Sequence, residues 1–138
     1  VIDRWGRLSD PTYFAAGNLL RGVETAGWCW SEGRRTARAV LAALAGSLPQ
    51  PGGAKVRLGH PALRLAVPQV IGSGADDAPH DRLQIRLDRP ARGSLCLMQA
   101  GRVLSSVRLD SLPERRLSLP LPAAPGAEPL TLEIKERP

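Results

Sequence analysis

Residues 83–87 read Leu83-Gln84-Ile85-Arg86-Leu87, with an apolar side chain at every second position. A period of two is typical of a β-strand that buries one face. The same alternation recurs along the second half of the chain, with turn-forming residues between the repeats. The further stretches are residues 56–58, 63–67, 95–97, 103–109, 117–119 and 130–134. About seven short strands at this spacing predict a small antiparallel β-sandwich over residues 55–138.

Upstream of these stretches the period changes to that of a helix. Thr25 is a good N-cap residue, and apolar or small residues follow it at every third or fourth position. We expect this stripe to be buried; it consists of Trp30, Gly33, Ala37, Val40, Leu41 and Leu44. Gly46 and Pro49 predict the end of the helix. Before the helix, residues 11–16 are β-prone and run into the turn residues Gly17-Asn18, which predicts a short strand.

The change of period divides the chain into three parts. They are a strand–loop–helix unit over residues 1–48, a Pro/Gly-rich linker over 49–54 and the β-sandwich over 55–138, so the predicted fold class is α+β. A single strand leaves backbone groups unpaired along both edges, and fewer than 50 residues are too few to cover the helix stripe. A strand that feeds a helix is typical of an α/β sheet. We therefore expect the chain to begin inside a larger α/β domain.

The charge distribution argues against a nucleic-acid-binding protein. The chain carries 19 Lys+Arg and 13 Asp+Glu, a net charge of +6. The arginines are dispersed and alternate with apolar residues, and no aromatic residue follows Trp30. A nucleic-acid interface needs a basic stripe with aromatic side chains for stacking. We expect most of these arginines to lie on solvated faces, and we predict no nucleic-acid partner.

Membrane, disulfide-rich and metal-binding classes are not predicted either. The longest uncharged, mostly apolar run, residues 39–48, is about half as long as a bilayer span requires. Cys29 and Cys96 are too far apart for a metal-ligand spacing. We expect two free thiols in the cytoplasm, with a bridge between them as the alternative. His60 and His80 each adjoin a proline in a predicted loop, and we expect both to be exposed.

The residues around the predicted helix start resemble a known family. Residues 10–18 read DPTYFAAGN, and residues 19–34 read LLRGVETAGWCWSEGR. This segment resembles the last FAD-contacting segment of the pyridine nucleotide–disulphide oxidoreductase-like flavoproteins. Within them it is most similar to the FAD-bearing subunits of opine oxidase and hydrogen cyanide synthase. The resemblance implies a strand that runs into a turn, followed by a helix that begins beside the flavin.

The resemblance also implies which residues contact the cofactor. Gly17 would let the backbone approach FAD closely. Asn18 stands where the family usually has an Asp that contacts the ribityl chain, and its amide can still donate and accept. The remaining expected contacts are the backbone groups of Glu24, Thr25 and Ala26 and the side chain of Trp28. The partial positive charge of the helix start would stabilise the negative charge of the reduced flavin.

The activity that the resemblance implies is hydride transfer to FAD from an amine or amino-acid type substrate. No side chain stands out as an acid or base for that reaction, so we assign no catalytic residue. No Gly-x-Gly-x-x-Gly motif follows a strand in this chain. FAD would therefore need upstream dinucleotide-binding domains as partners, which also allows NAD(P) in the intact enzyme. We expect the isolated chain to be inactive and not to hold FAD.

The alternative function belongs to a different class. In this second hypothesis the β-sandwich is a non-catalytic interaction or assembly module of a multi-subunit complex, such as an oxidoreductase with other subunits. Both hypotheses can hold for one protein, because the two halves of the chain carry different patterns.

Overall fold

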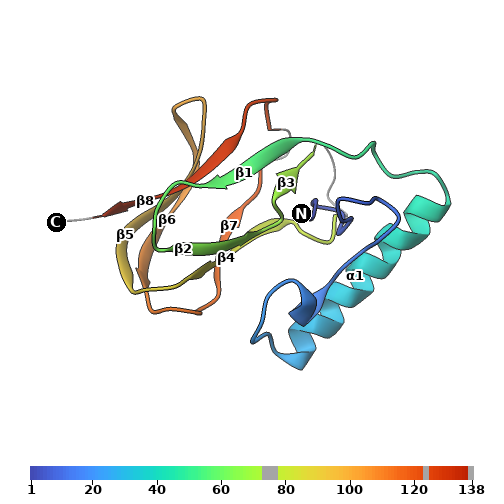
Figure 1. The fold of residues 1–138 in the computed structure, drawn as a ribbon, viewed down its shortest axis with the longest axis horizontal. Coiled ribbons are helices and arrows are strands. Elements are labelled where there is room, and N and C mark those ends of the chain that lie inside the picture. The colour runs from blue at the N-terminus through green and yellow to red at the C-terminus, as the bar shows by residue number, and fades with distance from the viewer. Residues whose placement is uncertain (73–77, 123–124, 137–138) are drawn as a thin grey trace.

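Two stacked β-sheets form one end of the molecule, and a long helix projects from the other (Figure 1). The computed structural model describes residues 1–72, 78–122 and 125–136. In chain order the elements are η1 (Gly17–Leu19), α1 (Ala26–Leu44), β1 (Ala54–Leu58), β2 (Leu63–Val67), β3 (Val70–Ile71), β4 (Arg82–Leu87), β5 (Ala91–Gln99), β6 (Arg102–Ser111), β7 (Leu117–Pro120) and β8 (Leu130–Glu136). The described part is therefore α+β, as predicted.

All seven stretches with a period of two form strands. The larger sheet has the order β3-β1-β8-β5-β6, and the smaller has the order β2-β4-β7. The additional strand, β3, has 2 residues and is too short to show a period. The predicted sandwich was antiparallel, but β1 pairs parallel with β8. The chain passes through all the other strands between β1 and β8, so no hairpin forces them to be antiparallel.

Both faces of the smaller sheet are covered. Leu83, Ile85 and Leu87 of β4 point into the core between the sheets and are fully buried. Gln84 and Arg86 occupy the alternate positions of the same strand, yet they are only 4% and 3% exposed. Because alternate side chains lie on opposite faces, another layer must cover the outer face of β4.

The N-terminal segment is that layer. Val67 of β2 pairs with Gln84 and so lies on the outer face, where Ile2 and Ala15 pack against it. The backbone of Ile2 accepts a hydrogen bond of 2.9 Å from the amide of Gln69. The residues expected to form a separate strand–loop–helix unit are therefore packed on the sandwich.

The strand predicted over residues 11–16 is not formed. In the described part of the chain, this stretch contributes an isolated bridge between Phe14 and Arg7. Ala16 is extended, with φ −151° and ψ 164°, and Ala15 is buried. The prediction was wrong because a strand needs a neighbour to complete its ladder, and none of the described strands pairs with this stretch.

The predicted limits of helix α1 are confirmed. The hydroxyl of Thr25 accepts a hydrogen bond from the amide of Trp28, as an N-cap does. At the other end Gly46 has φ 67°, and its amide donates to the carbonyl of Ala43 at 2.9 Å. This left-handed glycine closes the helix in the usual way. No helix in the described residues is long and apolar enough to cross a membrane.

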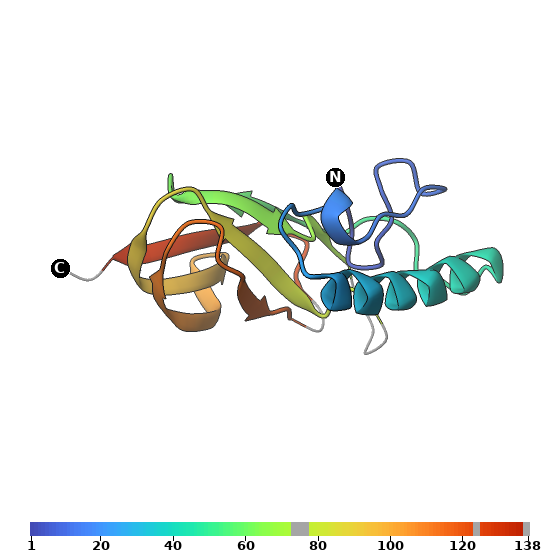
Figure 2. The same cartoon turned by 90° about the horizontal axis from the view of Figure 1, so that it is seen from below.

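The predicted buried face of α1 is wrong. Trp30, Leu41 and Leu44 are 65%, 66% and 82% exposed. The other stripe positions are exposed (Ala37) or half-buried (Gly33 and Val40). The buried helix residues are instead Glu32, Thr36 and Ala39. Figure 2 shows that α1 starts beside the sandwich and runs away from it, so the apolar stripe has no described element to pack against.

Candidate functional site

The glycine turn expected to contact a cofactor packs tightly against the first turns of α1. Gly17 is buried, and its amide donates to Oε2 of Glu32 at 2.6 Å. It has φ 67°, which favours glycine, and a Cβ there would lie 3.2 Å from Cβ and Sγ of Cys29. Both the backbone conformation and the short distance to Cys29 therefore favour glycine at this position.

Asn18 and Glu24 join the glycine turn to the start of the helix. Oδ1 of Asn18 accepts a hydrogen bond of 2.8 Å from the amide of Glu24. Two groups expected to contact the cofactor thus already bond each other. The exposed Asn18 keeps its Nδ2 amide for a further partner.

The start of α1 is open to solvent. Thr25, Ala26 and Gly27 are all exposed. The carbonyl of Thr25 accepts the amide of Cys29 at 3.0 Å, which is the first full helical hydrogen bond. The amides of Ala26 and Gly27 precede it and belong to the end where an α-helix has no intrahelical partners. This end can therefore bind an electronegative group.

Trp28 lies beneath an arginine of the sandwich. Cζ of Arg116 is 4.2 Å from the centroid of the Trp28 ring, a cation–π distance. The indole Nε1 is buried and has no hydrogen-bond partner among the described residues. One face of the Trp28 ring is thus already occupied, which limits its use as a cofactor contact to the edge or the other face.

Glu24 is the centre of a buried ion cluster that the sequence did not reveal. Its side chain is fully buried. Oε1 accepts from Nη2 of Arg86, Oε2 accepts from Nη2 of Arg116, and Nε of Arg21 lies 3.5 Å from Oε1. We expected most arginines to lie on solvated faces; Arg4, Arg7, Arg21 and Arg86 are buried instead.

Glu32 forms a second ion pair next to this cluster. Its Oε1 accepts from Nη2 of Arg21 at 2.7 Å and lies 3.5 Å from Nδ1 of His80. Arg21 therefore contacts both buried carboxylates and links the two pairs. Glu32, Thr36 and Ala39 have helical spacing and form the buried face of α1, but a stripe of small and polar residues does not identify a buried face in the sequence.

His80 is fully buried and His60 is half-buried, contrary to the prediction that both are exposed. The amide of His80 donates to the carbonyl of Arg4 at 3.1 Å, which holds this loop against the N-terminal segment. Burial lowers the pKa of His80 to about 4, and the charge of Glu32 opposes this only in part. His80 is therefore neutral at neutral pH. The adjacent proline was misleading, because it marks a loop but not whether that loop is covered.

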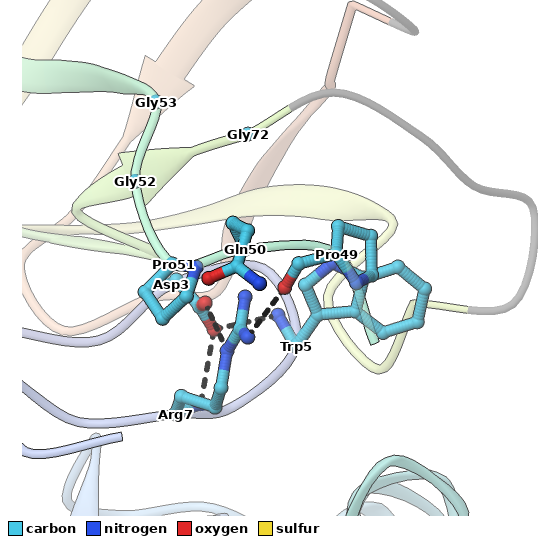
Figure 3. Close-up of a pocket in the computed structure, with 9 residues that line it drawn as sticks. All are labelled: Asp3, Trp5, Arg7, Pro49, Gln50, Pro51, Gly52, Gly53 and Gly72. Atoms are coloured by element: carbon cyan, nitrogen blue, oxygen red, sulfur yellow. Dashed lines mark hydrogen bonds and ion pairs between the residues drawn. The ribbon is translucent and has the colours of Figure 1, made fainter. Parts of the chain in front are cut away.

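A separate polar cluster surrounds a cavity of about 190 Å³ at the predicted linker (Figure 3). Oδ1 of Asp3 accepts from the amides of Trp5 and Arg7, at 2.9 and 3.0 Å. Oδ2 accepts from Nε of Arg7 at 2.7 Å, and Nη1 of Arg7 donates to the carbonyl of Pro49 at 2.7 Å. These polar groups satisfy one another, so we assign the cluster to fastening the linker and not to binding a ligand.

The cysteines are free thiols, as predicted: Cys29 is half-buried and Cys96 is buried. Residues 1–72, 78–122 and 125–136 contain no cluster of His, Cys, Asp and Glu that could hold a metal ion. The buried Glu24 and Glu32 are held in ion pairs, so we assign them structural roles. The groups that remain free to bind a ligand at this site are the backbone amides at the start of α1 and the Nδ2 amide of Asn18.

Comparison with known proteins adds no relative: no family model matches the chain, and no curated protein and no solved structure matches it.

Proposed function

We propose that residues 1–48 are the flavin-contacting end of an FAD-dependent oxidoreductase and that residues 55–138 form a β module attached to it. One observation carries this proposal. The turn at Gly17 and Asn18 is bonded to Glu32 and Glu24, beside an α-helix whose first residues are exposed. A turn and an open helix start in this arrangement can present donors to a single ligand.

The donor groups fit the electron-rich edge of a flavin. Helix α1 has 19 residues, so its N-terminus carries the full partial positive charge of a helix dipole. Fixed donors of this kind stabilise negative charge that develops on a bound group. The Nδ2 amide of Asn18 is available to a ribityl hydroxyl. When bound, FAD supplies hydride acceptance from an amine or amino-acid type substrate, and this chain binds and orients it.

Exposed apolar side chains in the first 44 residues support a further protein surface that covers this part of the molecule. Most of the large exposed hydrophobic residues in the described part lie within the first 44 positions: Val1, Tyr13, Leu19, Val23, Trp30, Leu41 and Leu44. An exposed apolar surface of this kind marks a contact with another protein surface. In our proposal, upstream dinucleotide-binding domains, which hold most of FAD and allow NAD(P), cover it.

The free thiols bear on where this enzyme works. Unpaired cysteines are the rule in a reducing compartment. We include a cytoplasmic location in the proposal on the ground that Cys29 and Cys96 are both free.

The second candidate function, a non-catalytic assembly module, rests on the edge strand β6. It ends the order β3-β1-β8-β5-β6, and its neighbouring residues Val103 and Leu104 are both exposed. An edge strand with exposed apolar residues can pair with another chain. Replacing both residues by lysine should abolish a subunit contact through β6, which sedimentation velocity would detect as loss of the larger species. Unchanged sedimentation would argue against this candidate.

The flavin proposal is tested at Asn18 in the protein that carries this segment with its upstream domains. The Asn18→Leu variant removes both the Nδ2 donor and the acceptor for the Glu24 amide, so the ratio of flavin absorbance to protein after gel filtration should fall. Asn18→Asp keeps the acceptor and should retain flavin. Gln50→Leu, at an exposed residue of the linker, is the matched control. Full flavin content in the Asn18→Leu variant would contradict the proposal. Stoichiometric FAD bound by residues 1–138 alone would contradict the part of it that requires upstream domains.

A further inference from the structure

Two arginines of the β-sandwich bind Glu24, the residue that immediately precedes the N-cap of α1. Arg86 lies in β4, and Arg116 lies directly before β7. Each places a guanidinium Nη2 on a different oxygen of the Glu24 carboxylate. Glu24 and Arg86 are buried, so water does not compete for the bond between them, whereas the Arg116 side chain is partly exposed. Charge-assisted hydrogen bonds in such surroundings are about twice as strong as neutral ones.

The same residue holds the glycine turn through its backbone. The amide of Glu24 donates to Asn18 at 2.8 Å, and the next residue is the N-cap Thr25. The carboxylate of Glu24 is thus fixed in the sandwich, while its amide is fixed to the turn. A displacement of the sandwich therefore moves the turn and the helix start together.

Arg116 reaches the helix start at a second point. Besides its bond to Glu24, its guanidinium stacks on the Trp28 ring at 4.2 Å. The two contacts hold the arginine in two directions, toward the Glu24 carboxylate and toward the face of the Trp28 ring. An apolar residue of the same volume could fill this space but could not fix the directions.

We infer that Arg86 and Arg116 are positioning residues, through which the β module sets the placement of the glycine turn and the α1 start against the flavin. This inference rests on the proposed function. The effect of a helix dipole on a bound group falls off within the first turn of the helix. A small shift of α1 therefore changes how well reduced flavin is stabilised, and the β module tunes the flavin potential without touching the cofactor.

The first arm of the test needs no flavin and uses residues 1–138. Arg116→Gln is the variant, because a side chain that is 38% exposed can be changed without unfolding the chain. Within residues 17–28, hydrogen exchange at the hydrogen-bonded amides of Gly17, Glu24 and Trp28 should become about fivefold faster, as expected for loss of one partly exposed ion pair. Exchange in β5 and β8 should not change. Arg92→Gln, which removes the exposed pair with Asp110, is the matched control and should leave residues 17–28 unchanged.

The second arm uses the full-length flavoprotein. In Arg116→Gln the flavin content should be retained, while the reduction potential measured by spectroelectrochemistry becomes more negative. The sign follows because a displaced helix start stabilises the anionic reduced flavin less. Arg116→Lys keeps the charge without the planar fork and should give a smaller shift in the same direction. Arg92→Gln should leave the potential unchanged.

The outcomes separate the two proposals. Unchanged exchange at residues 17–28 in the Arg116→Gln variant overturns the inference. Faster exchange with an unchanged potential, in a protein that holds flavin, also overturns the inference but leaves the proposed function standing. A full-length protein without flavin overturns the proposed function and the inference together.

Discussion

Replacing Arg21 by methionine tests the buried ion pairs that join the helix to the rest of the molecule. Arg21 is almost completely buried in the loop between η1 and α1. Its Nη2 donates to Glu32 at 2.7 Å, and its Nε lies 3.5 Å from Glu24. Methionine keeps much of the apolar volume and removes the charge. The variant thus leaves two buried carboxylates with one cation fewer.

The size of the loss follows from what each carboxylate retains. Removing one partner of a buried ion pair costs about 3–5 kcal/mol, because the other charge stays buried. Glu32 keeps the hydrogen bond from the Gly17 amide at 2.6 Å, and Glu24 keeps Arg86 and Arg116. These remaining donors place the loss for Arg21→Met at the lower end, about 3 kcal/mol.

Urea unfolding followed by far-UV circular dichroism measures this loss. Arg21→Met, Glu32→Gln and the double variant form a cycle at neutral pH. The double variant removes both charges, so its loss should be smaller than the sum of the single losses, by about 2 kcal/mol. Arg92→Gln, an exposed control, should change the free energy of unfolding by less than about 0.5 kcal/mol.

Two results would refute this reasoning. One is a loss below about 1 kcal/mol in Arg21→Met, which is typical of an exposed pair and not of a buried one. The other is additivity in the cycle, which would mean that Arg21 and Glu32 act on stability independently. Either result would also mean that Arg21 does not couple the two buried carboxylates, Glu24 and Glu32, energetically.

Three further predictions use the same unfolding assay. Leu97→Ala, a truncation in the fully buried core, should cost about 2–5 kcal/mol. Gly17→Ala should cost more than Gly46→Ala, because both have φ 67° but a Cβ at Gly17 lies 3.2 Å from Cβ and Sγ of Cys29, whereas no described atom lies within 4 Å of one at Gly46. Cys29→Ala removes Sγ and keeps Cβ, so it should recover part of the difference. The pKa of His80 is lowered from 6.5 to about 4. The unfolded chain therefore binds more protons between these values, and stability should fall by about 3 kcal/mol as the pH drops through this window. His80→Phe should remove that part of the slope.

The strands were predictable because alternation is a local signal. In residues 83–87 every second side chain is a leucine or isoleucine, and the structure buries all three against the other sheet. The parallel pairing of β1 with β8 was not predictable, because it depends on which strands meet and not on the pattern within either one. Strand β3 was not predictable either, because its 2 residues are too few to show an alternation of apolar and polar side chains.

The limits of α1 were predictable for a similar reason, and its buried face was not. Thr25 and Gly46 act through their own backbone geometry, which the sequence carries. The choice of face depends on partners. Glu32 points inward because Arg21 and the Gly17 amide donate hydrogen bonds to its carboxylate. The usual arrangement, in which the apolar stripe of a helix is buried, is therefore reversed.

The buried arginines show where alternation misleads. Arg86 occupies an outward position of β4, as the pattern indicates, but the N-terminal segment covers that face. Its partner Glu24 lies 62 positions earlier in the chain. A pattern within one strand holds no information about a layer contributed from so far away, so a solvated arginine and a buried one look alike in the sequence.

The location of these ion pairs links the two candidate functions. Burying Arg86 with Glu24 stabilises a domain less than an apolar pair of equal volume would, so stability alone does not explain it. What the pair adds is direction: it fixes one residue, next to the N-cap, against one strand. The edge strand β6 belongs to the other, larger sheet. A β module can therefore bind a further subunit through β6 while its smaller sheet keeps the helix start in place.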